Sequence, residues 1–236
     1  MFNSLTILII FTHILILCSS SVNYAADNMA PNDNKQNRVE EIFYYYGEIT
    51  SLTFNFSQRT ETTARTRIGD GNAIFFRPTI QSGIMRWNYT SPDKQVVIND
   101  GHNISIYTEN DKQMLVTPAS ALESDITYQL LNGNIDILKD FSIDFSPPPS
   151  NQNDNSIYSS IKITPKTPQN QLKNMRFWFD DHNIIHQIDI TDHFETITTL
   201  KFTNIIVNNI QADDSATLSA IIDFTPPPGT EIIRQQ

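Results

Sequence analysis

The 236-residue sequence contains a single cysteine, Cys18, which lies close to the amino terminus. One thiol cannot form an intramolecular disulfide, and it cannot supply the several cysteines of a structural zinc site. If the chain is cleaved after Ala26, as argued below, the mature protein has no thiol. A chain of this size buries about 70% of its unfolded surface, so a core without cross-links is sufficient.

Charged residues are absent from the first 26 positions, where Leu5–Leu17 forms an almost uninterrupted apolar run. This run is shorter than the roughly 20 residues of a membrane-spanning helix. Small residues follow it, ending at Ala25-Ala26, so residues 1–26 are predicted to be a cleaved secretory signal peptide. Two alternatives stay open: an uncleaved anchor, because no Lys or Arg precedes the run, and a lipid attached to Cys18.

Basic residues are the minority among the charged residues, with 16 Lys and Arg against 26 Asp and Glu and a net charge of −10. Nucleic acids and anionic membranes attract clustered Lys and Arg. The charge balance therefore argues against both as partners and fits a soluble protein that meets a basic surface elsewhere.

The sequence lacks the Gly-x-Ser-x-Gly, phosphate-loop and zinc-helix motifs of common enzymes. His182, His186 and His193 lie near one another in the sequence, but on a strand the third would face away from the first two. We interpret them as a turn followed by a strand, with no metal site. The sequence predicts neither an enzyme nor a cofactor; a lipid-binding hydrolase is the alternative and would require a defined nucleophile.

The spacing of apolar residues predicts two helices. Residues 27–38 are polar and are expected to be a flexible segment. Val39, Ile42, Phe43 and Tyr46 then follow the spacing of one helix face, with Gly47 at the expected end. A second, short helix is predicted over residues 125–131.

Elsewhere the period is two, which is typical of strands with one buried face. TFNFSQ (53–58) and MRWNY (85–89) alternate in this way, and SIDF, FWF, IDI, LKF and IIDF repeat the pattern toward the carboxyl terminus. Turn residues separate the strands at 91–93, 100–101, 109–111 and 180–181. We predict a mainly β (α+β) domain over residues 39–236, a long curved antiparallel sheet with two helices and some loops over one side.

Three stretches, GNAIFFRP (71–78), MRWNYTSPDKQVVINDGHNISIY (85–107) and KQMLV (112–116), together resemble the outer-membrane lipoprotein carrier (LolA) family. IIDFTPPPGTEII (221–233) resembles the end of the same proteins. The similarity is dense between Gly69 and Tyr107 and thin between Pro147 and Lys173. This chain departs from the family at Thr79–Ile84, where relatives often have fewer residues.

The resemblance implies an incomplete antiparallel β-barrel with a helical lid over an apolar cavity. It implies a periplasmic carrier that accepts acylated lipoproteins from an inner-membrane lipoprotein-releasing ABC transporter and delivers them to an outer-membrane receptor. We expect a monomer. The family's arginine falls on Arg77, which the resemblance assigns to hold the lid shut. A membrane-tethered receptor or sensor of the same fold, anchored through Cys18, is the alternative.

Counting by twos places large apolar side chains on the same side of the sheet as Arg77. The predicted cavity lining consists of Phe54, Phe56, Phe75, Met85, Trp87 and Tyr89, with Ile126 and Leu130 contributed by the lid. The alternative is that each of these side chains fills a solid core. As a set beside an inward arginine they favour a cavity, because a solid core would leave the guanidinium without partners.

Overall fold

One sheet of 12 strands forms the body of the protein. The computed structural model describes residues 33–78, 83–122, 128–129, 134–145, 158–169, 172–211 and 214–235. The predicted signal peptide, Cys18 and positions 79–82 lie outside these residues. The strands are β1 (Ser51–Glu61), β2 (Thr66–Phe76), β3 (Ile84–Ser91), β4 (Gln95–Asn99), β5 (Asn103–Thr108), β6 (Gln113–Pro118), β7 (Phe141–Asp144), β8 (Ser159–Pro165), β9 (Asn174–Phe179), β10 (Ile185–Thr191), β11 (Ile197–Val207) and β12 (Glu231–Arg234).

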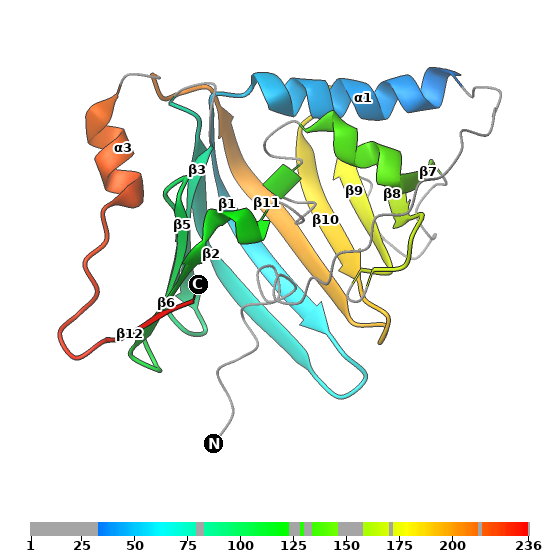
Figure 1. Cartoon of the computed structure of the whole chain (residues 1–236). Helices are drawn as coiled ribbons and strands as arrows, with labels where there is room; N and C mark the ends of the chain where they lie inside the picture. Colours follow the sequence, from blue (N-terminus) through cyan, green and yellow to red (C-terminus); the bar gives the residue numbers. More distant parts are fainter. Residues whose placement is uncertain are drawn as a thin grey trace.

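The strands follow the order β12-β6-β5-β4-β3-β2-β1-β11-β10-β9-β8-β7. Neighbours pair antiparallel except β12, which runs parallel to β6 at one edge. The sheet curves strongly, and its edge strands β12 and β7 do not pair with each other (Figure 1). The prediction of an incompletely closed, mainly antiparallel barrel is therefore confirmed.

The helix α1 (Asp33–Glu48) lies across one end of the curved sheet (Figure 1). Its buried residues Val39, Ile42, Phe43 and Tyr46 belong to one apolar cluster with the inward side chains of the strands. The predicted helix face is thus the buried one. The helix begins at Asp33 instead of Val39, so residues 33–38, which were predicted to be flexible, are helical.

A second helix, α3 (Ser215–Ile222), packs on the other face of the sheet. Its Ile221 is buried with Phe76 and Ile84, side chains that point away from the α1 cluster. Asp214 starts the helix by accepting a hydrogen bond from the Thr217 amide, as an N-cap does. The sequence pattern, which predicted helices only around residues 39–46 and over 125–131, did not predict this one.

The prediction of a strand at the IIDF segment (221–224) was wrong, because Ile221 and Ile222 form the last turn of α3. In the predicted second helix, 125–131, only Tyr128 and Gln129 are described, and both are helical. Two 3-10 helices were not predicted, η3 (Ala119–Leu122) and η4 (Ile135–Asp140), and η4 lies beneath α1 (Figure 1).

The predicted turns at 91–93, 100–101, 109–111 and 180–181 each connect two antiparallel strands. At Asp100-Gly101 the aspartate carboxylate accepts hydrogen bonds from the amides of His102 and Asn103, and Gly101 has φ 89°. Among the described helices, none is long and apolar enough to cross a membrane.

Candidate functional site

The inward face of the sheet carries a cluster of aromatic rings centred on Trp87. The ring of Trp87 lies 5.4 Å from that of Phe54 and 4.9 Å from that of Phe56, and Phe56 lies 4.8 Å from Tyr89. Phe202 of β11 joins the cluster at 4.9 Å from Phe54. These edge-to-face and tilted contacts are the arrangements that aromatic pairs prefer.

Small residues of β2 let the rings meet across that strand. Gly71 pairs with Phe56 on one side and with Tyr89 on the other, and Ala73 pairs with Phe54 and Trp87 in the same way. A Cβ atom at position 71 would lie 2.7 Å from the Phe56 ring and 2.1 Å from the Asn88 carbonyl oxygen. β2 thus supplies space where β1 and β3 supply aromatic side chains.

The six predicted lining residues on the strands all point to this face and are between 2% and 7% exposed. They belong to the cluster that α1 covers. In this structure the apolar face is therefore covered by the helix and by its neighbours, and water has little access to it. Ile126 and Leu130, the predicted contributions of the lid, lie outside the described residues.

Arg77 follows β2 directly and connects the sheet to the end of α1. Its guanidinium donates hydrogen bonds to the carbonyl oxygens of Gly47 and of Ile49, the latter at 3.0 Å. Its backbone amide donates to the Thr50 carbonyl at 2.7 Å. A guanidinium has five N–H donors, so one side chain can satisfy several carbonyl groups at the end of a helix.

The environment of Arg77 is half-buried and partly apolar. The guanidinium carbon lies 5.4 Å from the centre of the Phe75 ring, within the range of a cation–π contact. Burial lowers the pKa of Arg77, while the charges of Glu48 and Tyr128 act in the opposite direction. The side chain stays protonated at neutral pH, because an arginine does not lose its proton in proteins.

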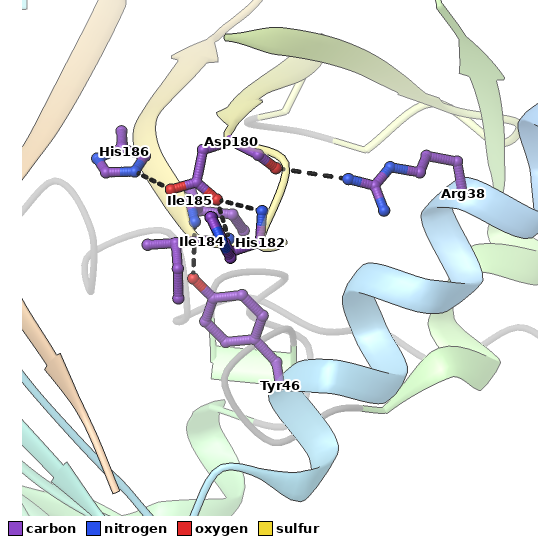
Figure 2. A network of polar contacts seen from close by, with 7 residues as sticks. All are labelled: Arg38, Tyr46, Asp180, His182, Ile184, Ile185 and His186. Carbon is purple, nitrogen blue, oxygen red and sulfur yellow. Dashed lines mark hydrogen bonds and ion pairs between the residues drawn. The ribbon is translucent and has the colours of Figure 1, made fainter. Parts of the chain in front are cut away.

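The β9–β10 turn contacts α1 at a second point (Figure 2). The Tyr46 hydroxyl accepts a hydrogen bond of 3.0 Å from the backbone amide of Ile185. Arg38 donates to the carbonyl oxygen of Asp180 at 3.4 Å, and its guanidinium lies over the Phe179 ring. The sequence pattern assigned Tyr46 to the apolar helix face and gave no sign that its hydroxyl would bind this turn.

The Asp180 carboxylate organises the same turn. It accepts hydrogen bonds from the backbone amides of His182 and Ile184 and pairs with His186 Nε2 at 2.8 Å. Burial alone would raise the pKa of Asp180, but the hydrogen bonds from His186 and the two amides outweigh it and lower the pKa. The turn therefore presents a fixed backbone to α1.

His186 and His193 each contact a neighbouring residue of the protein. The ring of His186 stacks on Tyr158 at 4.6 Å, and His193 Nε2 lies 2.6 Å from the Gln169 carbonyl oxygen. Across the described parts of the chain, no three His, Cys, Asp or Glu side chains lie close enough together to hold a metal ion.

A family model described as outer membrane lipoprotein carrier protein LolA matches residues 47–216, which is more than half of the chain. The chain belongs to the LolA family. A protein of Nitrosomonas europaea named outer-membrane lipoprotein carrier protein is 24% identical over 208 residues, 87% of this chain and 93% of that protein. One of the same name from Azotobacter vinelandii is 22% identical and covers 93% of this chain and 98% of its own length.

Solved structures resemble this LolA family member in fold. An uncharacterized conserved protein from Thermus thermophilus superposes with a TM-score of 0.52 at 7% identity, covering 85% of this chain and all of that one. MucB superposes with a TM-score of 0.51 at 10% identity, covering 84% of this chain and 66% of its own. At these identities the likeness concerns the fold alone.

Proposed function

We propose that this protein is a lipoprotein carrier that shelters acyl chains against the aromatic inward face of its sheet. Membership of the LolA family and the names of its relatives support this proposal. The observation that carries it is an open sheet whose inward face is lined by aromatic side chains and covered by the amphipathic helix α1. Arg77 connects the end of this helix to the sheet. We propose that the carrier performs no chemical step on its cargo.

The energetics of acyl chains explain why such a face needs a lid. Each buried methylene stabilises binding by about 0.8 kcal/mol, so one long chain gains on the order of 10 kcal/mol from shelter. A solidly packed barrel has no room for it. Displacement of α1 would uncover the apolar surface that contains Phe54 and Trp87. The acyl chain would then cover this surface in place of the helix.

Hydrogen bonds from Arg77 to α1 are suited to a reversible lid. They are exchangeable, and their loss on opening opposes cargo binding. We propose that this opposition keeps the cargo releasable, so that an outer-membrane receptor takes up lipoproteins that an inner-membrane ABC transporter has supplied. The site of action would be the periplasm, reached through the predicted signal peptide.

A transfer assay with purified receptor tests this role. We expect Arg77→Leu to fold, to load acylated lipoprotein and to deliver it poorly, because the closed state no longer competes with the cargo. Normal delivery by this variant would refute the role of Arg77. Mass spectrometry of the exported protein tests localisation: a start near Asp27 supports a soluble carrier, and a diacylated Cys18 supports a tethered form.

A further inference from the structure

The inward face changes from apolar to polar at the end of the sheet that lies away from α1. Of the five neighbouring strands from β5 to β1, all except β2 present a polar side chain inward here: Gln58 from β1, Tyr89 from β3, Gln95 from β4 and Thr108 from β5. The Tyr89 hydroxyl donates to Gln58 Oε1 at 2.8 Å, and Gln95 Nε2 donates to Thr108 Oγ1 at 3.2 Å. We call these four residues the polar row.

The strand register places the polar row on the same face as the aromatic cluster. Tyr89 is opposite Gln95 and Gln95 is opposite Thr108, while Trp87 is opposite Val97 on the same side of β3 and β4. Side chains two residues apart on a strand share a face. The polar row therefore borders the proposed acyl-chain site directly.

Gln95 is the member of the row whose hydrogen bonding is incomplete. It is 4% exposed, yet its Oε1 has no hydrogen-bond partner. Exchanging the oxygen and nitrogen of the amide would leave the other atom without a partner instead. Buried polar atoms are almost always hydrogen-bonded in native proteins, so an exception requires an explanation.

We propose that the polar row binds the amide that joins an acyl chain to a peptide, and that the free side-chain atom of Gln95 receives its hydrogen bond. An amide offers both a donor and an acceptor, so it can pair with Gln95 in either orientation of the side chain. The acyl chain then extends from the polar row across Trp87 toward α1. This inference rests on the proposed function and adds the polar group that the site recognises.

Two peptides of one sequence test the proposal by binding to the full-length mature protein. One carries an N-palmitoyl chain, and the other carries an S-hexadecyl chain whose thioether has no carbonyl and no N–H. Gln95→Met keeps the length of the side chain and removes its amide. We expect its dissociation constant to rise about fivefold for the N-palmitoyl peptide, as for one neutral hydrogen bond. Affinity for the S-hexadecyl peptide should be unchanged.

A matched control is Gln187→Met, because Gln187 lies in β10 beside the inward Ile188 and hydrogen-bonds Asp189. It should leave both affinities unchanged. The melting temperature of Gln95→Met should be equal to that of the wild type or higher, since the unpartnered atom is gone. If this variant does not fold, Thr108→Val replaces it, removing the hydroxyl that orients the Gln95 amide, and the same selective loss is expected.

If Gln95→Met weakens the binding of both peptides equally, or of neither, the polar row does not recognise an amide. The proposed function would still stand. Failure of the wild-type protein to bind either peptide would overturn the proposed function and this inference with it.

Discussion

Replacing Arg77 by leucine should release the end of α1 from the sheet. The wild-type guanidinium donates to the carbonyl groups of Gly47 and Ile49, and a hydrogen bond to a charged group contributes about 1.5–3 kcal/mol. The guanidinium is half-buried and was desolvated when these bonds formed, so we take about 2 kcal/mol for the pair together. Opening of α1 should then become roughly 30-fold more frequent.

Amide hydrogen exchange measures this opening directly. The backbone amides of residues 39–48 should exchange roughly 30-fold faster in Arg77→Leu than in the wild type, while the amides of the central strands keep their rates. Arg59→Leu is the matched control, because Arg59 is an exposed arginine of β1 that pairs with Glu61. Unchanged exchange in α1, or equal acceleration in both variants, would refute the idea that Arg77 holds the helix.

Three further predictions concern packing and charge. Gly71→Ala should lower the free energy of unfolding by about 1–3 kcal/mol in urea, because its methyl group would overlap the Phe56 ring, whereas Gly69→Ala, with its nearest contact at 3.4 Å, should cost less. Tyr46→Phe should cost about 1–3 kcal/mol by leaving the buried Ile185 amide unpaired, and an unchanged urea midpoint would contradict this. The lowered pKa of Asp180 contributes stability above the unfolded-state value of 3.8, and this is lost as pH falls through the folded-state pKa. Acidification should therefore destabilise the wild type more than Asp180→Asn, and equal losses would argue against it.

Alternation of large apolar residues was sufficient to predict the strands β1 and β3 and their inward faces. Phe54 and Phe56, and Trp87 and Tyr89, each follow a strict period of two, and one period fixes which face is buried. The Asp100-Gly101 turn likewise fixed a hairpin by local chemistry. These features depend on neighbours in sequence, which is why the residues alone revealed them.

Features that depend on tertiary contacts were not predictable in this way. Ile221 and Ile222 read as a strand because a short apolar run does not distinguish strand from helix, and the N-cap at Asp214 was not recognised as one. The apolar helix pattern around Tyr46 gave no sign of its hydrogen bond, because the partner, the Ile185 amide at the β9–β10 turn, is distant in sequence. Gln95 gave no signal either, since an inward glutamine is recognised only once the register of β3, β4 and β5 is known.

Quenching of tryptophan fluorescence tests the central claim most directly. The chain has two tryptophans: Trp87 points to the inward face, and Trp178 lies in β9 beside Arg176, outside the inward cluster. A lipopeptide with a brominated acyl chain quenches only the tryptophan that it contacts. We predict strong quenching in Trp178→Phe, where Trp87 remains, and little in Trp87→Phe. Equal quenching in both variants, or quenching of Trp178 alone, would contradict an acyl-chain site on the inward face.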